Sequence, residues 1–110
     1  MDLTRGHDHE QHRALIERVA TVGFVMPGTL RNARRRCGRP TCRCATSLEQ
    51  GHGPYHQWTR KIEGKTRTLR LTDQQAEIYG PWFGNAKQLR ALIADREHLG
   101  LSIFERNETN

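Results

Sequence analysis

Residues 34–58 read RRRCGRPTCRCATSLEQGHGPYHQW, and this stretch contains every cysteine of the chain, Cys37, Cys42 and Cys44, in a C-x4-C-x-C pattern. His52 follows after a loop of small and polar residues. A structural zinc site takes four thiolate or imidazole ligands and leaves no position for water. The stretch therefore predicts that Cys37, Cys42, Cys44 and His52 bind one Zn²⁺ ion and that the fold is organised around it.

Other interpretations of the same residues stay open. His56 lies four residues after His52 and could be the fourth ligand in its place. The thiols could also be reduced core side chains, or one of them could have a redox or catalytic role. A disulfide scaffold is disfavoured, because three cysteines are an odd number and we expect no secretory signal before them.

The composition indicates a small basic protein. Its 110 residues suit one domain, expected over residues 10–105 between a polar lead-in of residues 1–9 and a polar tail of residues 106–110. Only 35% of the residues are hydrophobic, so the core is thin and a metal ion would help to hold it. The net charge of +6 favours a polyanionic partner, above all nucleic acid. No apolar run is long enough to span a bilayer, and we expect a cytoplasmic protein without a membrane partner.

The segment from residue 55 to residue 71 predicts a β-hairpin. Its two halves alternate in side-chain type, and Glu63-Gly64 between them fits a two-residue turn in which Gly64 adopts a positive φ. This turn would set the register, so that Trp58 faces Leu69 and shares the core side with Leu71. The other side would be polar and basic, without a carboxylate, and would consist of Gln57, Thr59, Lys61, Thr66, Thr68 and Arg70.

A polar sheet face of this kind has two interpretations. Antiparallel sheets commonly leave one side in water, and threonine is a good strand former. A sheet can also enter a DNA groove, where Gln, Arg, Lys and Thr side chains reach phosphates and base edges. The net charge favours the second interpretation. We therefore expect that face to bind nucleic acid, with duplex DNA as the first target. The arginines of the preceding strand, Arg34, Arg35 and Arg36, would support the binding.

Helical and extended patterns precede the cysteines. Leu15, Val19 and Val22 recur at spacings of four and three, which predicts a helix over residues 10–22. After a Pro-Gly turn, residues 29–36 are expected to form a basic strand that leads into the cysteine-rich stretch.

Two helices are expected after the hairpin. Thr72 and Gln75 form a capping box that begins a helix, which Gly80-Pro81 would end or kink. Pro81 then suits the first turn of a second helix with an apolar face, which could pack inside the chain or form a dimer seam. The prediction is an α+β fold with an N-terminal helix, a small antiparallel three-stranded sheet with a Cys-rich loop, and two C-terminal helices.

With these motifs in view, the sequence resembles a family of small uncharacterised bacterial proteins classed as a domain of unknown function. The resemblance covers residues 22–99. It implies a setting among mobile-element genes, with a recombinase or transposase as a protein partner. The motifs that carry it are GFVMPG at residues 23–28, CGRPTCRC at 37–44, HGPYHQWTRK at 52–61, GKT at 64–66, and the segment 71–82.

A second likeness concerns residues 58–79, WTRKIEGKTRTLRLTDQQAEIY. They are similar in pattern to the arm-site DNA-binding domains of phage-type tyrosine recombinases, in which a three-stranded sheet enters the major groove and a helix follows. Those domains generally lack a cysteine cluster, so the transfer of function to this sheet rests on fold analogy.

These observations lead to two hypotheses of function. The first is a zinc-stabilised DNA-binding accessory protein of a mobile genetic element. The alternative is a protein-interaction adaptor that acts through the amphipathic helix of residues 82–99, as a homodimer or with another protein. We expect no enzymatic activity, because the sequence shows no nucleophile elbow, Gly-rich phosphate loop or H-E-x-x-H motif.

Overall fold

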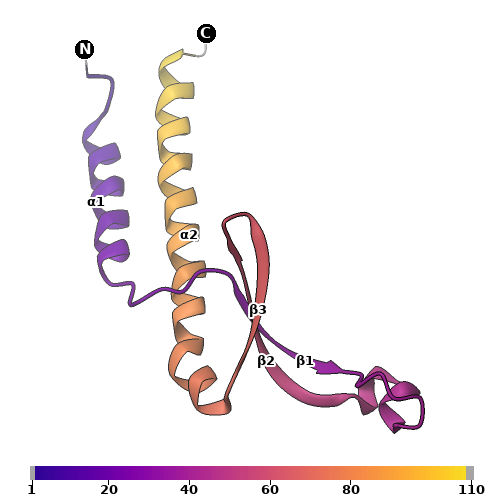
Figure 1. Ribbon diagram of the computed structural model, residues 1–110. Coiled ribbons are helices and arrows are strands. Elements are labelled where there is room, and N and C mark those ends of the chain that lie inside the picture. The colour runs from indigo at the N-terminus through magenta and orange to yellow at the C-terminus, as the bar shows by residue number, and fades with distance from the viewer. Residues whose placement is uncertain (1, 109–110) are drawn as a thin grey trace. The chain divides into compact units, whose positions relative to one another are not determined.

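The computed structural model describes residues 2–108 (Figure 1). Contacts group these residues into two compact units, residues 26–83 and residues 2–25 with 84–108, and each is described by itself. The prediction of a single domain over residues 10–105 stays a prediction. Along the chain the elements are α1 (Gly6–Ala20), β1 (Thr29–Arg35), the 3₁₀ turns η1 (Arg43–Ala45) and η2 (Leu48–Gln50), β2 (His52–Ile62), β3 (Lys65–Leu71) and α2 (Asp73–Glu108).

The sheet of residues 26–83 is antiparallel with strand order β1-β2-β3, which confirms the predicted three-stranded sheet. The hairpin has the predicted register, with Trp58 opposite Leu69. Glu63 and Gly64 form its two-residue turn with φ values of 52° and 80°. Two successive positive φ values are those of a type I′ turn, whose twist matches that of the flanking strands. The turn therefore fixes which side chains share a face.

Trp58 is the main core residue of this unit, with 9% of its surface exposed. Its Nε1 donates to the carbonyl oxygen of Pro27 at 2.8 Å, so the buried indole N–H is satisfied. The Phe83 ring from α2 meets Trp58 edge-on, with 6.1 Å between centroids. The segment before β1 and the start of α2 thus cover the same side of the sheet.

The predicted burial of Leu69 beside Trp58 is wrong, because 53% of Leu69 is exposed. β3 is an edge strand with a neighbour on one side only. The Arg60 guanidinium lies over the Trp58 ring at 3.8 Å from its centroid, and this cation–π contact covers part of the indole. Leu71, next to the start of α2, is buried as predicted.

The prediction of two C-terminal helices is also wrong. The Thr72 capping box is present, with Gln75 N donating to Thr72 Oγ1 at 3.0 Å and Thr72 N donating to Gln75 Oε1 at 2.9 Å. α2 then continues through Pro81 to Glu108. A proline normally clashes with the Cβ and N–H of the residue before it, and Gly80 has no Cβ to clash. Pro81 has no N–H to donate within the helix, yet α2 continues, so one helix replaces the expected two.

The other unit pairs α1 with the later turns of α2, and the two helices run antiparallel (Figure 1). α1 begins at Gly6, four residues before the predicted start, because Asp8 accepts the backbone N–H of Arg5 at 2.7 Å and so caps the first turn. Arg106, in the expected polar tail, lies in the last turn of α2. Leu92 and Ala86 are the buried apolar residues described in this unit. Neither helix of residues 2–108 has the length and apolar character needed to cross a bilayer.

Candidate metal centre and basic sheet face

The pairing of β1 with β2 brings His52 next to the cysteine-rich loop. Arg35 pairs with His52 at the end of the ladder, after a register shift between Ala33 and Arg35. Cys37 follows β1 by two residues, and η1 holds Cys44 inside the loop. The end of β1 and the start of β2 therefore place Cys37 and His52 at the same end of the sheet.

The four predicted ligands come together within this loop. One donor atom from each of Cys37, Cys42, Cys44 and His52 lies within 4.8 Å of every other. The Sγ atoms of Cys37 and Cys44 are 3.6 Å apart, and Cys42 Sγ is 3.5 Å from His52 Nε2. A tetrahedral ion with Zn–S bonds near 2.3 Å and Zn–N bonds near 2.0 Å gives S–S and S–N edges of about 3.8 and 3.5 Å. The cluster could hold a metal ion.

His56, the alternative fourth ligand, lies outside this cluster. Its Nδ1 is 2.8 Å from Asn32 Oδ1, and its Nε2 is 2.8 Å from Asp73 Oδ1. Both ring nitrogens are thus engaged, one with β1 and the other with the first residue of α2. The structure assigns the fourth position to His52.

The thiols of the cluster differ in acidity. The backbone N–H of Cys44 is the main cause that lowers the pKa of the Cys42 thiol to about 6, with further help from Cys44, His52 and Cys37. The Cys44 sulfur accepts the backbone N–H of Cys37 at 3.3 Å, which favours its thiolate. Burial and the neighbouring thiols outweigh this hydrogen bond and raise the pKa of Cys44. A metal ion would displace the remaining thiol protons, since it binds the thiolate form.

Arg34, an exposed residue of β1, contacts the segment that carries His52. Its Nη1 donates to the carbonyl oxygens of Gly51 at 3.2 Å and Gly53 at 3.3 Å, on either side of His52. These two contacts hold the backbone on both sides of His52. Arg34 therefore contributes to the backbone around His52, and its predicted role in nucleic-acid binding stays a prediction.

One face of the sheet carries cations and no carboxylate among the described residues; we call it the basic face. Arg31 and Arg70 both lie opposite Gln57, and Lys61 lies opposite Thr66. The period of two places every second residue of each strand on this side. Its members are Thr29, Arg31, Ala33, Arg35, Tyr55, Gln57, Thr59, Lys61, Thr66, Thr68 and Arg70.

The side chains of this face differ in exposure. Lys61, Thr66, Thr68 and Arg70 are exposed, as expected for a surface that meets a partner. Gln57 is 9% exposed, and its amide, oriented with the oxygen toward Arg35, accepts from Arg35 Nε at 2.6 Å and Nη2 at 2.9 Å. Gln57 thus holds Arg35 in place. The assignment of these residues to nucleic-acid binding stays a prediction.

Sequence reasoning missed two residues of the basic face, Arg31 and Tyr55. Arg31 precedes the three arginines that were singled out, and it shares a face with Arg35 but not with Arg34. Tyr55 carries the Arg70 guanidinium 3.8 Å above its ring centroid. The alternation of residues 29–35 predicts that Arg31 lies on the same side of its strand as Arg35. Only the register of β1 against β2 shows that this side is the one that carries Gln57.

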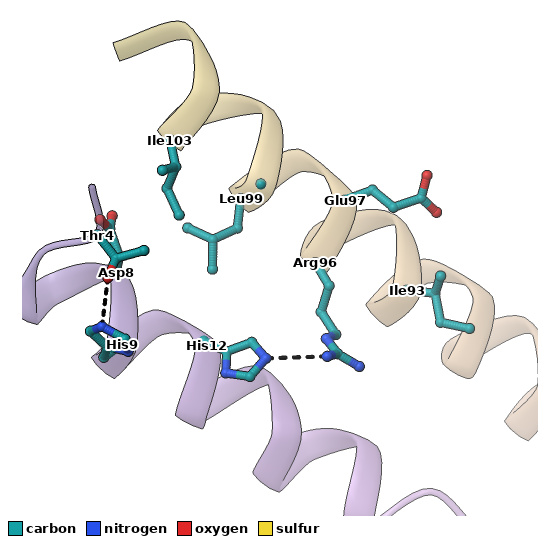
Figure 2. A pocket seen from close by; sticks show the side chains of 10 residues that line it. Thr4, Asp8, His9, His12, Ile93, Arg96, Glu97, Leu99 and Ile103 are labelled. Carbon is teal, nitrogen blue, oxygen red and sulfur yellow. Dashed lines mark hydrogen bonds between the residues drawn. The ribbon is translucent and has the colours of Figure 1, made fainter. Parts of the chain in front are cut away.

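Two grooves flank the helix pair formed by α1 and the later turns of α2. One has a volume of about 520 Å³, and Figure 2 shows its lining. In it, Arg96 Nη2 is 3.2 Å from His12 Nε2, and Thr4 Oγ1 is 2.8 Å from His9 Nε2. The second groove, of about 500 Å³, lies along Leu15, His98 and Ser102. Asp8 and Leu99 line both grooves.

Comparison with known proteins places the chain in a family. A family model described as Domain of unknown function (DUF6788) matches residues 8–80. The chain belongs to this family. The DUF6788 match includes the four residues of the cluster and all three strands. A search of curated proteins finds no match, and a search of solved structures finds none either.

Proposed function

We propose that this DUF6788 protein is a zinc-stabilised DNA-binding protein that contacts duplex DNA through its basic face. The single observation that carries the proposal is the charge of this face: Arg31, Arg35, Lys61 and Arg70 lie on it, with no carboxylate among its described residues. Phosphate contacts by Lys and Arg supply most of the affinity of such proteins for DNA. The accessory role in a mobile element, with a recombinase or transposase partner, belongs to the same proposal and rests on the family resemblance.

Zinc is the ion that suits the cluster best. Three thiolates and an imidazole are soft and borderline ligands, which favour Zn²⁺ over Mg²⁺ or Ca²⁺. Four protein ligands leave no position for water or substrate, so the role of the ion is structural. By joining the ends of β1 and β2, the ion would stabilise the basic face of a protein with a thin apolar core.

The basic face has a length that suits one DNA backbone. From the row of Arg31, Gln57 and Arg70 to the row of Lys61 and Thr66 is four residues along β2, or about 13 Å at the rise of a strand. DNA advances about 3.4 Å per base pair along its axis. The cations of the two rows can therefore reach phosphates several base pairs apart.

Binding to a short duplex of random sequence, measured by fluorescence anisotropy at several NaCl concentrations, tests the proposal. Lys61→Gln removes a cation from the basic face, and Lys65→Gln removes one from the other face of the same hairpin. We expect Lys61→Gln to lower the salt slope of binding by about 0.9, whereas Lys65→Gln leaves it nearly unchanged. Equal salt slopes for the two variants would contradict the basic face as the surface that contacts DNA. Absence of binding by the wild-type chain would contradict DNA binding itself.

The adaptor function is the second candidate, favoured by three apolar side chains of α2. Ile93, Leu101 and Phe104 are 46%, 57% and 62% exposed and lie on one side of the helix. The simplest occupant is a second copy, because two helix pairs can combine into a four-helix arrangement. Sedimentation of the wild-type chain and of the Leu101→Glu/Phe104→Glu variant tests this. A dimer that the variant loses supports the adaptor function, and a monomer at all concentrations contradicts this form of it.

A further inference from the structure

A hollow of about 330 Å³ lies where the basic face meets the metal cluster. Three arginines reach it from separate places in the chain: Arg35 at the end of β1, Arg36 just after it, and Arg70 near the end of β3. The other residues that line it are Cys37, His52 and Tyr55. Two ligands of the cluster thus form part of its wall.

Two of the three guanidinium groups are held in place before any ligand arrives. Arg70 lies over the Tyr55 ring at 3.8 Å from its centroid, and this cation–π contact restricts where the guanidinium can lie. Arg35 can be held by Gln57 through Nε and Nη2, so two of its donor groups are already used, and Arg36 and Arg70 are the cations that remain to receive a ligand. Side chains that are already ordered lose less conformational entropy when they bind.

The charge of the hollow stays positive when the cluster is loaded. A Zn²⁺ ion with three thiolates and a neutral imidazole carries one negative charge, whereas the three arginines carry three positive charges. None of the described residues that line the hollow is a carboxylate. Guanidinium forks match the oxygens of a phosphate and bind them in pairs. An anion with two or more oxygens in one plane is therefore the ligand that fits.

We propose that this hollow binds one backbone phosphodiester of the bound DNA, which Arg36 and Arg70 contact together. This inference rests on the proposed function. A backbone phosphate is favoured over a free anion because Arg35 and Arg70 belong to the basic face, so a strand that crosses this face continues into the hollow. The metal cluster then has a second effect beyond stability, since it positions the wall on which Arg36 and the phosphate meet.

The test compares salt slopes for duplex DNA with 5′-hydroxyl ends, using metal-loaded proteins of equal melting temperature. The variants are Arg36→Gln, Arg70→Gln and the double variant, and Arg67→Gln on the opposite face of β3 is the matched control. When two arginines share one phosphate, each single variant keeps one of them. We expect the singles to lower the slope by clearly less than 0.9, the double variant by about 0.9, and the control not at all.

Two results would overturn this shared contact with one phosphodiester. A double variant with the wild-type slope would mean that the hollow holds no phosphate. An additive loss of about 1.8 would mean that the two arginines contact separate phosphates. Failure of the proposed function is distinguishable from both, because the wild-type chain would then show no salt-dependent duplex binding.

Nitrogen-15 NMR of the arginine Nε signals gives a second measurement that identifies the phosphate. We expect the signals of Arg36 and Arg70 to shift with the 5′-hydroxyl duplex, and the signal of Arg67 to stay in place. Equal shifts with inorganic phosphate at the same low concentration would assign the hollow to free anions. Tighter binding of a 5′-phosphorylated duplex that the double variant loses would assign it to a terminal monoester. Either result would overturn the binding of a backbone phosphodiester.

Discussion

Asp8 and Arg106, from opposite ends of the sequence, form a two-point ion pair between α1 and α2. Arg106 Nη2 donates to Asp8 Oδ2 at 2.7 Å, and Arg106 Nη1 donates to Asp8 Oδ1 at 3.1 Å. The Asp8 carboxylate is 3% exposed. The same carboxylate caps the first turn of α1 through the Arg5 N–H. One side chain thus joins the start of one helix to the end of the other.

This pair predicts acid sensitivity of the helix pair. The hydrogen bonds from Arg106, with those from the Arg5 backbone, hold the pKa of Asp8 well below its usual range. A depressed pKa in the folded state contributes stability above the unfolded pKa of about 3.9, and that stability is lost as pH falls further. We expect the melting temperature to decrease as the pH drops below about 4. Asp8→Asn should lower the melting temperature at pH 7 and make it depend less on pH.

Thermal melts by circular dichroism between pH 2 and pH 7 measure this effect. Asp95→Asn, the same chemical change at an exposed carboxylate of α2, is the control and should behave as the wild-type chain. If Asp8→Asn and Asp95→Asn gave identical profiles, the pair would contribute nothing to stability.

The metal centre predicts different outcomes for substitutions of His52, which lies in it, and of His56, which does not. His52→Ala removes a ligand, so we expect it to abolish the binding of one zinc ion per chain, as should Cys44→Ser. His56→Ala should keep the full equivalent, because the His56 ring contacts Asn32 and Asp73 instead of the cluster. Metal analysis of freshly purified proteins by mass spectrometry decides this. Zinc retained by His52→Ala but lost from His56→Ala would reverse the assignment.

Protons should compete with the metal at the same centre. Ligating thiolates and imidazole must be deprotonated, so metal affinity falls as pH falls. Because metal binding is coupled to folding of small domains, zinc release and loss of the sheet should follow one curve. Zinc titrated with a colorimetric chelator and far-UV circular dichroism, followed together, test whether the two events coincide.

The hairpin and the metal ligands could be predicted because their signals are local. The register followed from a two-residue turn and a period of two, and both extend over fewer than twenty residues. The three thiols lie within eight residues of one another. His52 could not be chosen over His56 from sequence, because the choice depends on contacts of the His56 ring with Asn32 and Asp73, which are distant in the chain.

The rest depended on tertiary contacts that leave no local pattern. Gly80-Pro81 usually marks a helix end, yet α2 continues through it, and the missing Cβ of Gly80 removes one of the clashes that a proline causes in a helix. Arg34, Arg35 and Arg36 are alike in sequence. Their positions differ only through tertiary contacts, because Gly51 and Gly53 accept hydrogen bonds from Arg34, whereas Gln57 can accept them from Arg35.

A further prediction concerns the two large side chains that face each other across the hairpin. Trp58 is buried, so Trp58→Ala should destabilise the fold by about 3–5 kcal/mol. Leu69 lies opposite but is mostly exposed, and Leu69→Ala should change stability by about 0.5 kcal/mol or less. Urea unfolding followed by far-UV circular dichroism measures both. Similar losses in the free energy of unfolding for the two variants would show that Leu69 belongs to the core, as the sequence predicted.

The last prediction is a stabilising substitution at the hairpin turn. Glu63 has a φ of 52°, a conformation that costs most residues energy and that asparagine adopts more readily. Asn-Gly is the preferred pair for a type I′ turn. We therefore expect Glu63→Asn to raise the free energy of unfolding by up to about 1 kcal/mol. Glu63→Gln removes the same charge without easing the backbone, so it should give little of this gain. A gain of the same size in both variants would show that relief of charge, and not of backbone conformation, is what the turn responds to.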